Sequence, residues 1–259
     1  MKVDEGRRRR RRLLLALSVA VCVLTLEFFW QRGSVAGTTA RVTPVYDPPV
    51  LAGQMVVPIW CSGGVYGRVG EQIVVTSSGH CAGEGQTYTD AAGVAGVWGP
   101  DSYSATCPYE GYRCTASDMN YLIVAPDRIP WGHLNEIDMG AGGYRTVTPD
   151  TKPLECADIH EGDELEFDGR AIYRTGRVLT QREYLPPVAQ DPIYFPCIVI
   201  ADIEVGTGDS GAVVFVNGVP SGIASRRFGD LLGFPPLGSG LAELGVTLCT
   251  DPNCGLTPP

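Results

Sequence analysis

The chain has 259 residues, 44% hydrophobic and 19% charged, which suffices for one domain of about 200 residues with appendages. Residues 1–36 hold eight of the 20 Lys and Arg residues and three of the 29 Asp and Glu residues, leaving 12 basic and 26 acidic residues beyond them. A body with a net charge of −14 argues against nucleic acid as a partner. The 33 glycines and 20 prolines, between short apolar runs, favour an all-β domain over a helical one.

The N-terminus is typical of a membrane-targeting segment. Six consecutive arginines, Arg7 to Arg12, precede an apolar segment at 13–30, so residues 1–12 are expected in the cytoplasm and the rest outside it. Two interpretations stay open. The uncharged core of 14 residues and the small-x-small sequence at 34–36 fit a cleaved signal peptide. The full 18 residues are just enough for a single anchor helix, which the bulky run Glu27-Phe28-Phe29-Trp30 favours slightly.

Residues 31–49 are rich in Gly, Ser, Thr and Pro and predict a linker, after which residues 50–259 form the domain. Short β-like runs lie on both sides of the glycine-rich segment 140–143, in a first group at about 50–135 and a second at about 140–250. We expect strands within 55–59, 72–76, 94–98, 121–124, 144–148, 164–167, 177–180, 197–203, 212–216 and 219–225.

Three short motifs hold the residue types that nucleophilic catalysis needs. A serine hydroxyl attacks only when a base takes its proton, and a carboxylate must hold that base in the right tautomer. Glycines beside the serine let a substrate approach the main chain and leave the amides of Gly208 and Ser210 free to form an oxyanion hole. The motifs are Gly79-His80-Cys81, Ser117-Asp118 and Gly208-Asp209-Ser210-Gly211, each near an apolar run.

With His80, Asp118 and Ser210 in this order, 38 and 92 residues apart, the sequence resembles the chymotrypsin-like serine peptidases, closest to their bacterial secreted branch, over roughly residues 50–246. The resemblance implies two packed six-stranded antiparallel barrels, with His80 and Asp118 in the first, Ser210 in the second and the site between them. It implies a serine endopeptidase in which Ser210 attacks, His80 is base and then acid, and Asp118 orients His80. We expect a protein or peptide substrate, a monomer, and no metal or cofactor.

The same resemblance assigns the surroundings of the triad. Ser225 corresponds to the serine beside the triad carboxylate, and Asp209 to a buried aspartate that shapes the oxyanion loop and can pair with an internal arginine. Glu204, six residues before Ser210, corresponds to the base of the primary pocket. Arg226 and Arg227 stand where the family usually has an apolar residue and a glycine. Neutralisation of Glu204 by an arginine predicts a small or medium apolar residue before the cleaved bond, with a basic residue second.

Two alternatives stay open at this level. The strand after Asp118 can be aligned one step later, which places Asn120 at the orienting position, where an amide favours the wrong tautomer. Asp118 is preferred because it supplies the carboxylate. That register, together with Arg226 and Arg227, favours a catalytically impaired binding module at the cell surface. An acyltransferase or esterase could use the same triad.

The cysteines indicate export. Apart from Cys22 in the apolar segment there are eight, an even number that suggests disulfides in a secreted or membrane-anchored domain outside the cytoplasm. Metal binding is disfavoured because the chain has no CxxC pair and His80 is the sole neighbouring histidine. Eight cysteines allow 105 pairings. The resemblance pairs Cys61 with Cys81; short separations suggest two local pairs, which leaves a fourth. These three are Cys107–Cys114, Cys249–Cys254 and Cys156–Cys197.

Overall fold

The computed structural model describes residues 52–53, 55–56, 61–90, 93–102, 107–169, 172–186 and 192–259. The predicted segments 1–12, 13–30 and 31–49 lie outside these residues, and so do the alternatives of a signal peptide and an anchor helix. Within the described ranges, no helix is both long enough and apolar enough to span a membrane.

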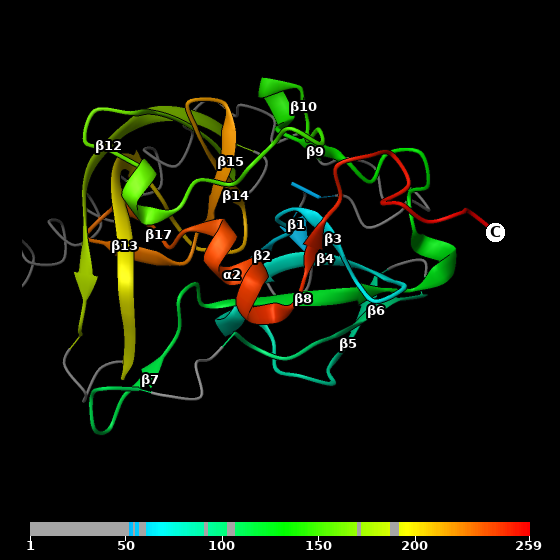
Figure 1. Ribbon diagram of the computed structural model, residues 1–259, viewed down its shortest axis with the longest axis horizontal. Helices are drawn as coiled ribbons and strands as arrows, with labels where there is room; N and C mark the ends of the chain where they lie inside the picture. Colours follow the sequence, from blue (N-terminus) through cyan, green and yellow to red (C-terminus); the bar gives the residue numbers. More distant parts are fainter. Residues whose placement is uncertain are drawn as a thin grey trace, which may run out of the picture. The chain divides into compact units, whose positions relative to one another are not determined.

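A six-stranded antiparallel sheet is built mainly from the first half of the domain, and those strands are cyan to green in Figure 1. Its strand order is β18-β3-β4-β8-β6-β5, so a strand from the C-terminal end completes the sheet beside β3. The strands are β3 (Tyr66–Val69), β4 (Gln72–Ser78), β5 (Thr87–Asp90), β6 (Gly93–Trp98), β8 (Met119–Val124) and β18 (Thr247–Leu248).

The second sheet follows the order β15-β14-β11-β12-β13-β17-β16, and the short strand β7 pairs in parallel with β13. The remaining neighbours are antiparallel. The strands are β7 (Arg113–Cys114), β11 (Glu164–Gly169), β12 (Ile172–Tyr184), β13 (Ile193–Glu204), β14 (Val213–Val216), β15 (Val219–Ile223), β16 (Arg226–Phe228) and β17 (Leu231–Phe234). β7 lies in the range predicted for the first group of strands but pairs with the second sheet, whereas β18 lies in the range predicted for the second group but pairs with the first sheet.

Short elements connect these sheets. They are the strands β1 (Met55–Val56), β2 (Cys61–Ser62), β9 (Glu136–Asp138) and β10 (Tyr144–Thr146), the 3₁₀ turns η1 (Gly79–Cys81), η2 (Pro126–Arg128), η3 (Gly140–Gly142) and η4 (Cys156–Asp158), and the helix α2 (Leu237–Leu244). Helix α2 starts after Pro236, whose fixed φ suits a helix start, and ends at Gly245 in the left-handed conformation that glycine adopts without strain.

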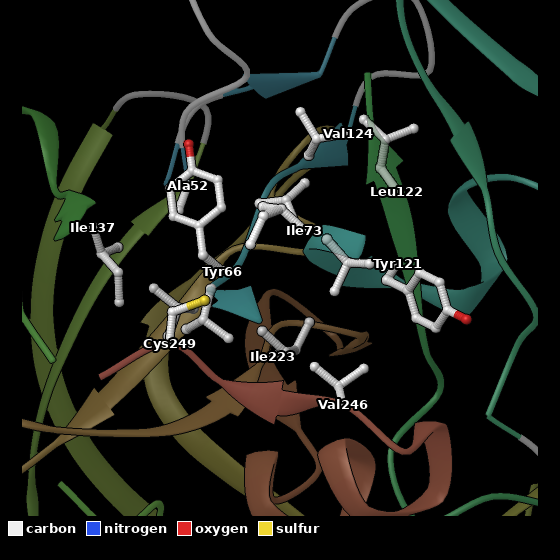
Figure 2. Close-up of a cluster of buried hydrophobic side chains, with 14 of the residues drawn as sticks. Ala52, Tyr66, Ile73, Tyr121, Leu122, Val124, Ile137, Ile223, Val246 and Cys249 are labelled. Carbon is white, nitrogen blue, oxygen red and sulfur yellow. The ribbon is translucent and has the colours of Figure 1, made fainter. Parts of the chain in front are cut away.

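The core shows why these runs form strands. All but the first residue of β4 and every residue of β14 are buried, as expected for strands covered on both faces, and both are rich in β-branched residues. The core of the first sheet also takes in Val213, Phe215 and Ile223 from the second sheet. Figure 2 shows Ile223 among the side chains of the first sheet. The two sheets therefore share apolar packing, and the predicted all-β fold is confirmed.

Four disulfides have the predicted pairing: Cys61–Cys81, Cys107–Cys114, Cys156–Cys197 and Cys249–Cys254. Cys61–Cys81 joins β2 to the turn η1, next to His80. Cys156–Cys197 joins the turn η4 to the middle of β13 and closes the longest of the four loops. Disulfides of this kind stabilise a domain chiefly by restricting its unfolded chain.

Removing Cys156–Cys197 should cost more than removing Cys249–Cys254, because their sequence separations are 41 and 5. Loop-closure entropy predicts losses of about 4 and about 2 kcal/mol in the free energy of unfolding. Urea unfolding of C156A/C197A and C249A/C254A measures both. Equal losses would show that native-state packing, not loop length, determines the contribution of each bridge.

Candidate active site

The three motif residues come from two sheets. His80 lies in η1, directly after β4, and Asp118 lies directly before β8. Because β4 and β8 are antiparallel neighbours, with Ser78 opposite Met119, their ends bring His80 and Asp118 together. Ser210 lies in the loop between β13 and β14 of the second sheet.

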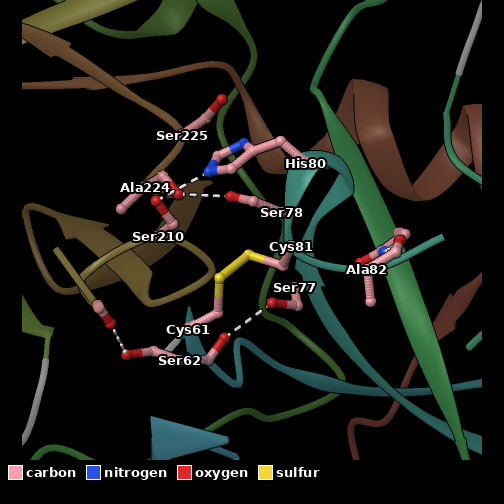
Figure 3. Close-up of a disulfide and its surroundings, with 12 residues drawn as sticks. Cys61, Ser62, Ser77, Ser78, His80, Cys81, Ala82, Ser210, Ala224 and Ser225 are labelled. Carbon is pink, nitrogen blue, oxygen red and sulfur yellow. Dashed lines mark hydrogen bonds between the residues drawn. A yellow bond between two sulfur atoms is a disulfide. The ribbon is translucent and has the colours of Figure 1, made fainter. Parts of the chain in front are cut away.

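The side chains of these residues form one hydrogen-bonded chain. The Nδ1 atom of His80 lies 2.8 Å from Oδ2 of Asp118, and Nε2 of His80 lies 3.0 Å from Oγ of Ser210. Figure 3 shows the imidazole facing the Ser210 hydroxyl above the Cys61–Cys81 bridge. The Asp118 side chain is fully buried, whereas 37% of the His80 side chain is exposed. The histidine is therefore accessible from the surface, while the carboxylate is shielded.

Asn120 takes no part in this chain of contacts. Its side-chain amide donates a 2.9 Å hydrogen bond to the carbonyl of Ala82, from a buried position within β8. The register that places Asp118 beside His80 is thus the one the structure has.

Two further groups face the Asp118 carboxylate. The Ser225 hydroxyl donates a 2.6 Å hydrogen bond to Oδ2, and Nη2 of Arg226 lies 3.6 Å from the same oxygen. The Arg226 guanidinium also lies over the ring of Phe195, 5.1 Å from its centroid. Ser225 thus lies beside the Asp118 carboxylate, whereas no pattern in the sequence pointed to the contact between Arg226 and Asp118.

The serine loop is held by a residue that the sequence analysis missed. Ser62 donates its amide to the carbonyl of Ser210 at 2.7 Å and its hydroxyl to the carbonyl of Gly208 at 2.9 Å. Gly211 has φ 92° and packs so closely that a Cβ there would lie 2.1 Å from the Ser62 carbonyl oxygen. In the described part of the chain, the amides of Gly208 and Ser210 donate to no protein acceptor, which leaves both available to a ligand.

Asp209 has the arginine partner that the sequence could not identify. Its buried Oδ2 lies 3.4 Å from Nη1 of Arg174 on β12 and accepts a 2.8 Å hydrogen bond from the amide of Gly206. The ion pair compensates a carboxylate that is 2% exposed. It ties the serine loop to the second sheet.

The predicted pocket residues lie in different surroundings. Glu204 is exposed, contrary to the expected buried carboxylate, because burial alternates at the C-terminal end of β13, where Ile203 and the following Val205 face inward. Arg227 is exposed on β16 as well. Arg226 contacts Asp118, and the exposed Glu204 is not the buried pocket carboxylate whose neutralisation by an arginine was expected. Within the described ranges, no group of three or more His, Cys, Asp or Glu residues could hold a metal ion.

A second carboxylate, Asp101, lies behind the triad. A Cβ at Gly79 would lie 3.0 Å from Oδ1 of Asp118 and 3.5 Å from Oδ1 of Asp101, so the two carboxylates flank the same point of the backbone. Burial raises the pKa of Asp101 to about 6, the negative charge of Asp118 adds to the rise, and Arg113 opposes it. Nothing near position 101 in the sequence indicated this proximity.

Comparison with known proteins identifies the class of fold. No protein-family model and no curated protein matches the sequence. Among solved structures, a serine protease specific for glutamic acid is 19% identical, with a TM-score of 0.56 over 77% of this chain and 100% of its own. Thermobifida fusca Protease A is 18% identical, with a TM-score of 0.57 over 77% and 98%. Cellulomonas bogoriensis chymotrypsin is 14% identical, with a TM-score of 0.56 over 78% and 100%.

These similarities define a class of structure. The described domain has the two-barrel fold of the bacterial chymotrypsin-like serine proteases, as the motifs around His80, Asp118 and Ser210 predicted.

Asp101→Asn should stabilise the protein in a pH-dependent way. With a pKa of about 6 when folded and 3.8 as the ordinary value, Asp101 holds a proton in the folded state that the unfolded chain releases between these values. Stability from this group therefore falls as pH rises from about 4 to 6. The variant should match the parent at pH 4 and melt about 2–4 °C higher above pH 7, after allowance for screening of a half-buried group. Thermal unfolding from pH 4 to 8 measures this; a constant difference would contradict it.

Proposed function

We propose that the protein is a serine endopeptidase that acts outside the cytoplasm through Ser210, His80 and Asp118. The observation that carries the proposal is the unbroken hydrogen-bonded chain from the buried Asp118 carboxylate through both His80 nitrogens to the Ser210 hydroxyl. The fold supports a peptide substrate, and the four disulfides support an oxidising compartment.

The geometry supports covalent catalysis in two halves. His80 Nε2 takes the proton of Ser210 as Oγ attacks the carbonyl carbon of the peptide bond, and the resulting imidazolium gives that proton to the departing amine. Water then attacks the acyl-enzyme, again with His80 as base, and releases the acid and Ser210. Asp118 holds Nδ1–H and so fixes the tautomer in which Nε2 can accept.

The oxyanion of each tetrahedral intermediate needs donors that are already in place. The amides of Gly208 and Ser210 suit this role, because the described structure gives neither a protein acceptor and because Ser62 holds the carbonyls of the same two residues. Donors fixed in this way need no reorganisation when charge develops, and one such donor is worth about 10²–10³ in kcat.

A catalytically impaired binding module is the second candidate. The contact that favours it is Arg226, which approaches the same Asp118 oxygen that holds His80. A permanent cation there compensates the carboxylate before any imidazolium forms, which reduces the stabilisation left for the charged intermediate. The two candidates make opposite predictions for reactivity at Ser210.

A fluorophosphonate probe should label the purified protein at Ser210, because the probe needs a serine activated by His80. Ser210→Ala and His80→Ala should abolish labelling, while Ser239→Ala, a surface change on α2, should leave it intact. Mass spectrometry of the labelled peptide measures the outcome. Absence of labelling in the parent protein would favour the binding module. Labelling without cleavage of a peptide library would favour the esterase or acyltransferase.

Asp118→Asn should lower kcat about 10⁴-fold with the fold intact, because the amide favours the wrong tautomer of His80. Asn120→Ala should reduce kcat only mildly, since Asn120 bonds to Ala82 rather than to the triad. Steady-state kinetics on a cleaved peptide compare the two variants. The reverse ranking would overturn the assignment of Asp118.

A further inference from the structure

Asp118 is held in a conformation that needs outside support. Its φ of 47° lies in the left-handed region, which costs a residue other than glycine about 1–3 kcal/mol and persists where the surroundings impose it. Its carboxylate is also supported on one side only. Oδ2 faces His80, Ser225 and Arg226, whereas Oδ1 has no hydrogen-bond partner in the described structure. The direction of the carboxylate therefore depends on how the backbone at Asp118 is held.

Three buried hydroxyl groups lie behind this backbone. Ser102, Thr115 and Ser117, here called the hydroxyl cluster, are each 2% exposed or less. The Oγ atom of Ser102 lies 3.1 Å from Oγ1 of Thr115 and 2.8 Å from Oγ of Ser117. Ser102 precedes the loop that the Cys107–Cys114 disulfide closes, and Thr115 and Ser117 follow it.

The hydroxyl cluster accepts hydrogen bonds from the two backbone amides on either side of the Asp118 Cα atom, where the strained backbone dihedral angles lie. The amide of Asp118 donates to Oγ1 of Thr115 at 2.9 Å, and the amide of Met119 donates to Oγ of Ser102 at 2.8 Å. The carbonyl of Asp118 accepts from the amide of Gly79 at 2.7 Å, one residue before His80. The peptide groups before and after Asp118 are thus both fixed, one of them by Thr115.

Helix α2 holds the hydroxyl cluster from outside. Glu243 accepts from the amide of Ala116 at 2.9 Å and faces the Thr115 and Ser117 hydroxyls at 3.4 Å each. A carboxylate only accepts, so these hydroxyls donate to Glu243 and keep their lone pairs for the backbone amides and for Ser102. The helix also packs closely: a Cβ at Gly240 would lie 2.2 Å from Sδ of Met119.

We propose that Thr115 is a positioning residue for the triad. Thr115 holds the Asp118 backbone so that the Asp118 carboxylate meets His80, and Glu243 of α2 fixes the orientation of the Thr115 hydroxyl. This proposal rests on the proposed function. Loss of the Thr115 acceptor lets the peptide before Asp118 rotate, and the carboxylate moves relative to His80 Nδ1. The effect falls on kcat, because Thr115 is buried away from the substrate.

The test is a double-mutant cycle between Thr115 and Asp118. Thr115→Val keeps the shape and removes the hydroxyl; it should lower kcat about 10-fold or more, with KM within about twofold. Thr115→Ser keeps the acceptor and should stay within about twofold of the parent. In an Asp118→Ala background there is no carboxylate to position, so Thr115→Val should change the residual kcat less than about twofold. An equal loss in both backgrounds overturns the proposal and indicates a general structural role.

A second readout is independent of peptidase activity. The hydrogen-bonded Nδ1 proton of His80 gives a downfield resonance in the proton NMR spectrum, which Thr115→Val should shift or abolish and Thr115→Ser should retain. An unchanged resonance overturns the proposal. If the parent protein cleaves no peptide, the proposed function fails, while this resonance still decides whether Thr115 positions Asp118.

A surface variant covers the case in which Thr115→Val does not fold. Glu243→Ala changes an exposed side chain of α2 and should lower kcat about threefold with an unchanged KM, again only when Asp118 is present. Ser239→Ala on the same helix is the matched control and should have no effect. A loss for Glu243→Ala that persists in the Asp118→Ala background contradicts the proposal.

Discussion

The structure of the site depends on the burial of one negative charge. The Asp118 side chain has no exposed surface, and a carboxylate taken out of water costs several kcal/mol unless partners compensate it. His80 directly follows β4 of the first sheet, whereas Ser225 and Arg226 lie at the start of β16 in the second, and all three face the same oxygen. The charge is therefore compensated only when the two sheets are packed together, and that packing also brings Ser210 to His80.

A second buried carboxylate organises the serine loop by the same physical rule. Asp209 pairs with Arg174 on β12, so the loop is tied to a strand far from it in sequence. Arg174 acts on more than one acid: burial raises the pKa of Asp168 to about 6, and Arg174 opposes that rise. On the other side of the loop, Ser62 bonds to Gly208 and Ser210 next to the Cys61–Cys81 bridge. The short strand β2, which carries Ser62, and the second sheet thus hold the Ser210 loop from two sides.

The close approach of His80, Asp118 and Ser210 could be predicted from the sequence because each is a distinctive residue type beside an apolar run. The residues that surround them could not. Ser62, Arg174 and Asp101 reach the site through strand pairing and loop packing, and no local pattern marks them. Glu204 shows the limit of counting from a motif: the count does not say which way a strand residue points, and β13 turns this one outward. Asp118 itself was the preferred residue, but its left-handed backbone and the hydroxyls that hold it are visible only in three dimensions.

The contact between Arg226 and Asp118 stabilises the folded protein but works against the proposed catalytic step. While His80 is neutral, the guanidinium is the sole full positive charge at Asp118 Oδ2 among the described contacts, so it stabilises the buried carboxylate. In the proposed mechanism, His80 takes the Ser210 proton, so a second cation forms 2.8 Å from the same oxygen and is repelled by the first. Three features limit this repulsion: Arg226 stands at 3.6 Å rather than in direct contact, it is partly exposed, and it shares its charge with the face of Phe195. An arginine at this distance and in this setting is compatible with turnover, whereas one at hydrogen-bonding distance would compete with the histidine directly.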